Sequence, residues 1–330
     1  MAVSAAIIAL YARFDLVTHT IVEGALYGFA FALYILCARL LYLQLSDKSQ
    51  DDQQQRKQSL FTLVYMSLVM VMALLGLIVD GRNAQTSYVD HADYPGGGFF
   101  YGLNVYARLP ICVMGYATSI LFEFLIFSVQ IWRLWVIWRT SRYSFLIVIV
   151  PILSLLAEVG SNVTVSVVTL VREDSDELQR LGYALIFVMQ SLMLAIDIIV
   201  SLGIIVRIIL VRRQHIKVMG QTDVADQYTS IISLLVESFA LTSVWMIMTT
   251  IFSSLGSVYP VLSAIGSFFL ATQPFIQLIA YLLVVYRVSM GRGWKKDTER
   301  KLTTLQWNRD EPQTTEFSTR ASLPVTQEEA

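Results

Sequence analysis

The sequence contains few charged residues. Asp, Glu, Lys and Arg make up 15% of its 330 residues, whereas about 25% is usual in soluble domains. Hydrophobic residues make up 55%. This composition excludes an ordinary water-soluble domain, so we take lipid as the solvent of most of the chain. The formal net charge of -1 argues against a nucleic-acid partner.

Cysteine and histidine are also scarce. The two cysteines, Cys37 and Cys112, stand in or beside apolar stretches and cannot build a disulfide framework or a cysteine-based metal site alone. The three histidines, His19, His91 and His215, fall outside the apolar stretches, which disfavours a zinc-dependent membrane hydrolase. The last apolar stretch lacks the Lys that a retinal Schiff base needs, and the motifs of intramembrane proteases are missing. We therefore expect no enzymatic activity, cofactor or metal site.

Long apolar stretches without Lys or Arg dominate what the sequence does contain. They cover about residues 20–38, 60–81, 109–132, 143–171, 181–206, 228–254 and 259–286. Such lengths suit a bilayer, and in lipid the backbone must satisfy its own hydrogen bonds, which favours helices. The sequence therefore predicts an all-α membrane protein, a seven-transmembrane helix bundle over residues 20–287. We expect an extracellular or interfacial N-terminal segment over 1–19, and a tail over 288–330 that is largely disordered beyond about 307.

The connections between the apolar stretches alternate between rich and poor in Lys and Arg. Assigned to the two sides of this topology, 19 of the 24 Lys and Arg residues fall on one side and 5 on the other. Because cytoplasmic loops carry the excess of Lys and Arg, we predict an external N-terminus and a cytoplasmic C-terminus. The long connection over 82–108 is then external. Its run of glycines, Gly96 to Gly98, suits either a lid over a cavity or a plain cover of the helix ends.

Four acidic residues lie deep in four of the predicted helices, namely Glu123, Glu158, Asp197 and Glu237, with no Lys, Arg or His at comparable depth. Ionisable groups are costly inside a bilayer and commonly mark functional sites. Without cations beside them they cannot all be ionised, so we expect some to be protonated and hydrogen-bonded. This acidic layer is the first candidate site.

Other polar residues share helix faces with this layer. Asn162 follows Glu158 by four residues, and Gln273 and Gln277 are also four apart, spacings that place each pair on one face. Two interpretations stay open. The groups either join the helices as polar contacts, or they form a proton or cation site or a polar cavity for a ligand.

Two further features bear on conformational change. Pro274 interrupts the hydrogen bonding of the last helix and is either a hinge or a static bend. Basic residues at the predicted cytoplasmic end of the fifth helix are candidates for coupling to a cytoplasmic partner. They are Arg207, Arg212, Arg213 and Lys217.

The segment from Tyr228 to Trp245, YTSIISLLVESFALTSVW, carries a Glu237-Ser238 pair after an aliphatic run. It resembles the sixth span of a large set of seven-helix membrane proteins of basidiomycete fungi. The seven spans, external N-terminus, basic inner loops and hydroxyl-rich tail also resemble the architecture of G-protein-coupled receptors. The usual motifs of rhodopsin-class receptors are replaced: TQPFIQLIAYLLVVYR stands where Asn-Pro-x-x-Tyr is expected. The resemblance implies a fungal receptor or sensor.

The sequence thus favours an integral plasma-membrane protein, receptor-like, that senses an unknown small ligand and signals to a cytoplasmic protein. The alternative is a transporter or lipid translocator in which the mid-membrane carboxylates couple to protons or cations.

Overall fold

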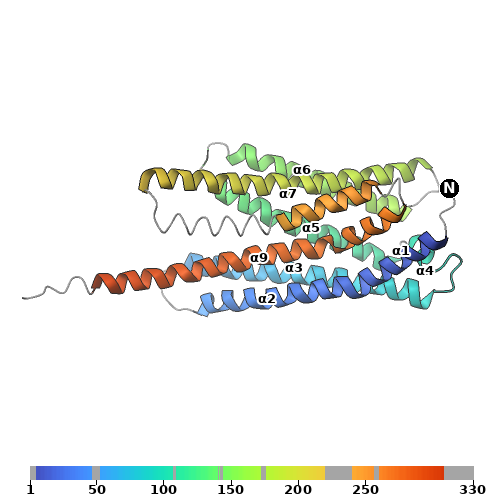
Figure 1. Ribbon diagram of the computed structural model, residues 1–330, viewed down its shortest axis with the longest axis horizontal. Coiled ribbons are helices and arrows are strands. Elements are labelled where there is room, and N and C mark those ends of the chain that lie inside the picture. The colour runs from blue at the N-terminus through green and yellow to red at the C-terminus, as the bar shows by residue number, and fades with distance from the viewer. Residues whose placement is uncertain are drawn as a thin grey trace, which may run out of the picture. The chain divides into compact units, whose positions relative to one another are not determined.

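The computed structural model describes residues 5–46, 53–106, 109–139, 141, 144–171, 176–219, 240–255 and 260–307. Within these ranges every regular element is a helix, as predicted. The elements are α1 (Ala5–Val17), the π-helical turn η1 (Thr18–Val22), α2 (Glu23–Ser46), α3 (Gln53–Gln85), a second π-helical turn η2 (Thr86–Asp90), α4 (Gly98–Asn104), α5 (Pro110–Trp138), α6 (Ser144–Val171), α7 (Asp176–Met219), the helix Ala240–Leu255, and α9 (Pro260–Trp307) (Figure 1).

Among the residues that the structure describes, six helical segments are long and apolar enough to cross a membrane. They are Leu10–Ser46, Arg56–Asp90, Pro110–Trp138, Ser144–Leu170, Ala184–Arg207 and Ala264–Met290. Each contains or overlaps one of the predicted spans. The predicted span over 228–254 is described only from Ala240, where it forms the shorter apolar helix Ala240–Leu255. The chain is a multi-pass integral membrane protein.

The exposed surface of these helices is apolar. Large hydrophobic side chains point outward along each of them, including Phe29, Val64, Leu121, Leu153 and Leu202. A soluble bundle would place polar residues on this face. Lipid tails are the solvent that such a surface fits.

The first helical segment begins earlier than the sequence predicted. We expected an exposed or interfacial stretch over 1–19, but α1, η1 and α2 follow one another without a break, and the candidate span starts at Leu10. His19, which the sequence analysis placed outside the spans, therefore lies within this helical segment.

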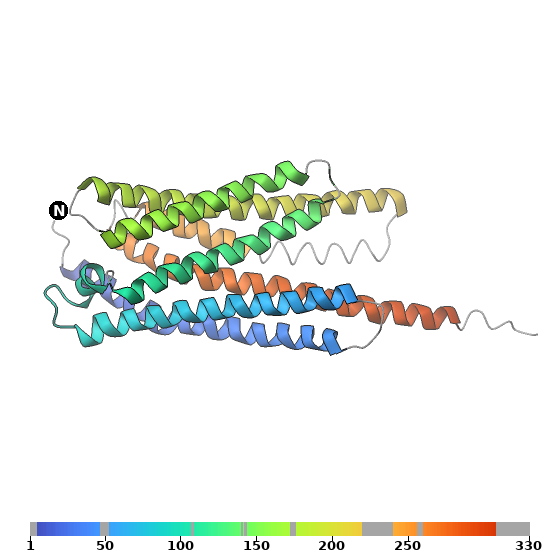
Figure 2. The ribbon, with the colours of Figure 1, turned by 180° about the vertical axis from the view of Figure 1, so that it is seen from behind.

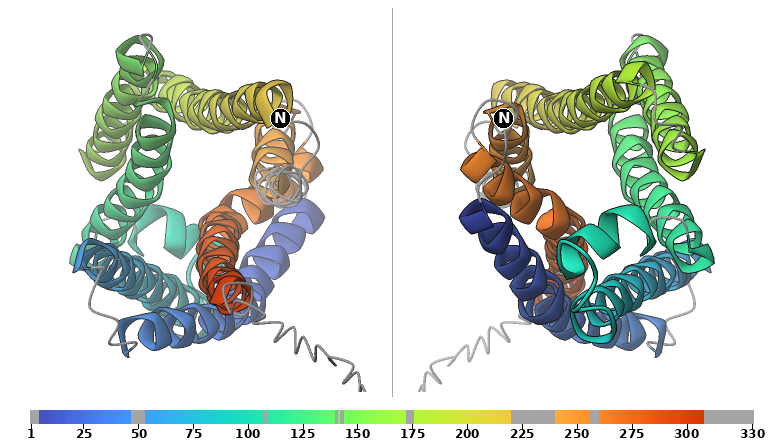
Figure 3. Two further views of the ribbon diagram at one scale, coloured as in Figure 1. Left: turned by 90° about the vertical axis from the view of Figure 1, so that its left-hand side faces the viewer. Right: turned by 90° about the vertical axis from the view of Figure 1, so that its right-hand side faces the viewer.

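The chain divides into two compact units, Met1–Ser289 and Met290–Ala330, with α9 contributing to both. In the first unit the long helices run lengthwise beside one another (Figures 1 and 2). The end views show α2, α3, α5, α6 and α7 following one another round the bundle in chain order (Figure 3). Neighbouring helices in this series contact each other, and α5 also contacts α7.

Two hydrophobic clusters hold the first unit together, and α5 takes part in both. One face of α5, with Phe122 and Ile126, packs with α2, α3 and α9. Another face, with Phe127 and Leu134, packs with α6, α7 and Met246 of the helix Ala240–Leu255. Since α5 joins the two clusters, polar residues on it are positioned by both halves of the bundle.

The candidate span of α9 is the most enclosed of the six. Of its most apolar stretch 67% is buried, against 17% to 33% in the others. Its residues Leu278 and Leu282 are fully enclosed, and the backbone carbonyl of Leu282 accepts a hydrogen bond from the Cys37 thiol at 3.5 Å. Because neighbouring helices enclose this helix, a shift of any of them would change the surroundings of its buried glutamines.

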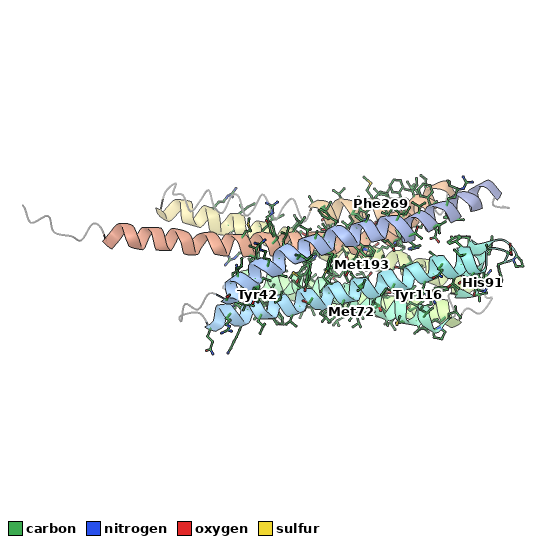
Figure 4. The ribbon with its side chains drawn as sticks, turned by 90° about the horizontal axis from the view of Figure 1, so that it is seen from below. Tyr42, Met72, His91, Tyr116, Met193 and Phe269 are labelled. Atoms are coloured by element: carbon green, nitrogen blue, oxygen red, sulfur yellow. The ribbon has the colours of Figure 1, made fainter. Side chains whose placement is uncertain are left out.

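The connection after α3 folds back onto the helix ends. Gly96 and Gly97 adopt φ of 93° and 89°, values that favour glycine, and they turn the chain into α4. α4 contacts both α1 and η2, and the Tyr106 hydroxyl donates to the Val79 carbonyl at 3.2 Å. His91 stacks on Tyr101 with ring centroids 3.9 Å apart, at the end of the bundle that carries α4 (Figure 4). The described part of this connection therefore covers the helix ends.

Candidate functional site

The structure brings together three of the predicted site residues at the contact of α5 and α6. The Asn162 amide nitrogen donates to Glu123 Oε2 at 2.8 Å and lies 3.4 Å from Glu158 Oε1. The two carboxyl groups therefore share one amide donor. Both acidic residues are buried, Glu158 almost completely. The spacing of Glu158 and Asn162 on one helix face, read from the sequence, is what makes this arrangement.

Two buried carboxyl groups that share one amide repel each other when both are ionised, and burial disfavours charge altogether. A proton on one of the two carboxyl groups removes this repulsion, and the Asn162 amide is suited to hold the remaining charge. Glu158 Oε2 is buried and has no hydrogen-bond partner among the described residues. The pair is therefore a place where a proton can be held or released inside the bundle.

Asp197 belongs to a separate contact. It is fully buried on α7 and accepts hydrogen bonds from the helix Ala240–Leu255, from Ser243 Oγ at 2.6 Å and from Thr242 Oγ1 at 3.3 Å to each carboxyl oxygen. These bonds join two helices, which is the structural role that polar groups commonly take in membranes. For Asp197 the geometry favours an inter-helix contact.

The glutamines form a third group, on α7 and α9. Gln273 donates to the Met193 sulfur at 3.6 Å, and Figure 4 places Met193 part-way along the bundle. Gln190 precedes Met193 by three residues, and Gln277 follows Gln273 by four. Because α7 and α9 run in the same direction (Figure 1), these two glutamines lie on opposite sides of the contact between Gln273 and Met193. The amide nitrogen and oxygen of both Gln190 and Gln277 are buried without a partner in the described part of the chain. The sequence analysis included Gln277 among the candidate site residues, whereas for Gln190 the sequence indicated only a helix face shared with Asp197, seven residues on.

Pro274 lies inside α9, which continues through it. Proline removes one backbone donor, and nearby carbonyls receive side-chain donors: Thr272 Oγ1 binds the Phe268 carbonyl at 2.7 Å, and Trp245 Nε1 binds the Phe269 carbonyl at 3.1 Å. The indole bond ties α9 to the helix Ala240–Leu255. The hinge at Pro274 stays a prediction.

The remaining predicted residues fall into two sets. Arg207 donates to the Ile137 carbonyl at 3.4 Å and lies over the Trp138 ring at 5.3 Å, so it takes part in the packing of α7 on α5. Arg213 is exposed, whereas the side chains of Arg212 and Lys217 lie outside the described ones. Glu237 also lies outside the described residues, and its inward orientation stays a prediction.

A polar cluster that the sequence analysis missed lies where α1, η1 and α2 meet α3 and η2. We call it the His19 cluster. His19 Nδ1 is 2.7 Å from Glu23 Oε1, and His19 Nε2 is 3.3 Å from Asp15 Oδ1. The Tyr88 hydroxyl donates to Asp15 Oδ2 at 2.8 Å. His19, Glu23 and Asp80 each offer one ligand atom, and these atoms lie within 4.8 Å of one another.

The signal for the His19 cluster was present in the sequence. Asp15, His19 and Glu23 are spaced by four residues, which places them along one helix face. The spacing was hidden because the first span was taken to begin at residue 20. Asp80 and Tyr88 could not be assigned to the cluster without the packing of α3 against η1, which the structure supplies.

Comparison of the chain with protein-family models, with curated proteins and with solved structures found no match in any of the three.

Proposed function

We propose that the chain is a receptor-like membrane protein that senses a small polar ligand inside the helix bundle and signals to a cytoplasmic partner. The observation that carries this proposal is that the buried amides of Gln190 on α7 and Gln277 on α9 lie on either side of the contact between Gln273 and Met193. Both lack hydrogen-bond partners among the described residues. A buried amide without a partner costs free energy, and a ligand that supplies donors and acceptors recovers it.

The position of these amides suits a sensor. Gln277 lies on the most enclosed helix, three residues after Pro274, and α9 is tied to neighbouring helices by Trp245 and by Cys37. A ligand that binds one arrangement of α9 better than another shifts the population toward it. The topological resemblance to G-protein-coupled receptors and to fungal seven-helix proteins, noted from the sequence, agrees with the same proposal, and we propose the plasma membrane as the location.

The Gln277→Leu variant tests the proposal. Leucine removes a buried amide that has no described partner, so the ligand-free protein should be stabilised by about 1 kcal/mol, whereas ligand responses should be lost. The measurement is a thermal-shift screen of small polar compounds on purified protein in nanodiscs. The exposed Gln58 on α3 provides the matched control, since Gln58→Leu should keep every response. A destabilised Gln277→Leu variant that still responds to compounds would count against a ligand site at this residue.

A transporter or lipid translocator is the second candidate, and the pair of Glu123 and Glu158 bridged by Asn162 favours it. Reconstitution in liposomes with a panel of ions and substrates separates the two functions. Saturable, proton-coupled flux that disappears in Glu123→Gln would support the transporter. Compound-dependent stabilisation without flux would support the receptor.

The proposed orientation has a test of its own. With 19 basic residues assigned inside and 5 outside, we expect the tail to be cytoplasmic and the connection over 82–108 to be external. A protease added to sealed, right-side-out vesicles should cut within 82–108 and leave an epitope at the C-terminus intact. Loss of the C-terminal epitope in sealed vesicles would reverse the orientation.

A further inference from the structure

We propose that His19, Glu23 and Asp80 bind a divalent transition-metal ion, with Zn²⁺ as the best match. This site goes beyond the proposed sensing function and does not depend on it. It lies in the His19 cluster, at the junction of the first helical segment with α3, and uses none of the glutamines of α7 and α9.

The donor set points to zinc. One imidazole nitrogen and two carboxylate oxygens lie within 4.8 Å of one another, close enough for small shifts to bring them round one ion. Zn²⁺ takes His and Asp or Glu ligands at about 2.0–2.2 Å, and three protein ligands leave a position for water or a further ligand. Ca²⁺ and Mg²⁺ prefer oxygen ligands throughout, so an imidazole in the set disfavours them.

The surroundings of His19 have the arrangement that metal-bound histidines use. Nδ1 is in hydrogen-bond contact with Glu23 Oε1 at 2.7 Å, a contact that an ion bound between the two would replace, whereas Nε2 faces the Asp15 carboxylate at 3.3 Å. Asp15 is itself held by the Tyr88 hydroxyl at 2.8 Å. A carboxylate behind the second ring nitrogen sets the tautomer and orientation of a ligating histidine. Asp15 and Tyr88 are therefore positioning residues for the metal ligand.

A second observation points to a ligand independently of the donor set. Glu23 is completely enclosed, and its Oε2 atom has no hydrogen-bond partner among the described residues. A carboxylate oxygen buried without a partner is costly, and a metal ion coordinated by it removes that cost.

The charge of the cluster agrees with a cation. Asp15, Glu23 and Asp80 contribute three acidic groups, and His19 is the one basic group among the five members of the cluster. A divalent ion offsets the excess negative charge that these carboxylates carry when ionised.

The backbone at the cluster is also unusual. His19 lies in η1 and Tyr88 lies in η2, the two π-helical turns that the described part of the chain contains. Single π-helical turns are rare and occur frequently at functional sites, because the wider turn redirects a side chain. Here both turns contribute a member of the same cluster.

The experiment uses full-length protein without a histidine tag, stripped with chelator in detergent and then titrated with ZnCl₂. Bound metal is measured by elemental analysis after desalting, and thermal stability is measured with and without zinc. We expect about one Zn²⁺ per chain and a higher melting temperature with the ion. Glu23→Gln and Asp80→Asn should weaken binding more than tenfold, and Asp15→Asn should weaken it by about 10- to 100-fold through its effect on His19.

Two control variants change a histidine and an aspartate outside the His19 cluster, the residue types that occur among the proposed ligands. The exposed His91 and Asp93 lie in the connection after α3, so His91→Gln and Asp93→Asn should bind zinc as the wild type does. Calcium and magnesium at the same concentration should not raise the melting temperature. Wild-type binding in Glu23→Gln, or equal losses in the two controls, would place the zinc elsewhere and overturn the proposal.

The wild-type protein alone supplies a measurement that does not depend on the folding of any variant. Co²⁺ in place of Zn²⁺ should give the visible absorption of a four-coordinate site with nitrogen and oxygen ligands, and Zn²⁺ should abolish it by displacement. Wild-type protein that takes up neither ion in stoichiometric amount would overturn the proposal outright.

Discussion

Replacing Gly98 with alanine is expected to destabilise the protein by about 2 kcal/mol, the cost of forcing an extra methyl group into a closely packed contact. A Cβ atom at this position would collide with the backbone carbonyl of Ser87, which cannot turn away as a flexible side chain could. Gly98 begins α4, and Ser87 lies in η2 beside Tyr88, which holds Asp15. The variant should therefore also weaken zinc binding.

The measurement for Gly98→Ala is the melting temperature of purified protein in detergent, followed by intrinsic tryptophan fluorescence. Gly160, inside α6, is the matched control because a Cβ there meets no atom within 4 Å. Gly160→Ala should be neutral or slightly stabilising, since alanine favours helix by up to about 1 kcal/mol over glycine. Equal melting temperatures for the two variants would show that α4 does not pack on η2 as described.

Replacing Asp197 with leucine is expected to cost about 2 kcal/mol, because Asp197 is fully buried and the change removes the acceptor of the hydrogen bonds from Ser243 and Thr242. Asp197→Asn keeps the shape and an acceptor oxygen and should cost less than half as much. Melting temperatures of both variants, together with size-exclusion profiles, report the effect.

A double-mutant cycle separates the hydrogen bond from other effects of Asp197→Leu. The double variant Asp197→Leu with Ser243→Ala should lose less stability than the sum of the two single losses. We expect a difference of about 0.6 kcal/mol, the average for hydrogen bonds between membrane helices, and at most about 1.7 kcal/mol. Additive losses would mean that Asp197 acts through some group other than Ser243. If Asp197→Leu proved as stable as the wild type, Asp197 would not join α7 to the helix Ala240–Leu255.

The membrane spans could be predicted from the sequence because, in a bilayer, whether a segment forms a spanning helix depends on that segment alone. Each segment in lipid must satisfy its own backbone hydrogen bonds, so length and apolar composition are enough to identify a helix such as Pro110–Trp138. The same scarcity of charge made Glu123, Glu158 and Asp197 conspicuous, and all three are buried in the structure. The spacing of Glu158 and Asn162 correctly indicated one shared face.

The partners of these residues depended on the rotation and pairing of helices, which the sequence does not record. Residues treated as one acidic layer separate in the structure: Glu123 and Glu158 meet through Asn162, whereas Asp197 binds Ser243. The partner of Glu123 depends on how α5 packs in both hydrophobic clusters, and the partner of Asp197 depends on how α7 packs against the helix Ala240–Leu255.

By itself the sequence determined the solvent of this protein, its helical class and the position of Glu123, Glu158 and Asp197 inside apolar segments, because each follows from composition and spacing along a single segment. The tertiary structure alone decided that Asp80 of α3 meets His19 and Glu23, and that Gln190 and Gln277 are buried without a described partner. The physical reason is that a metal site or a binding site needs atoms from several helices within a few ångströms. Only the packing of those helices sets such distances.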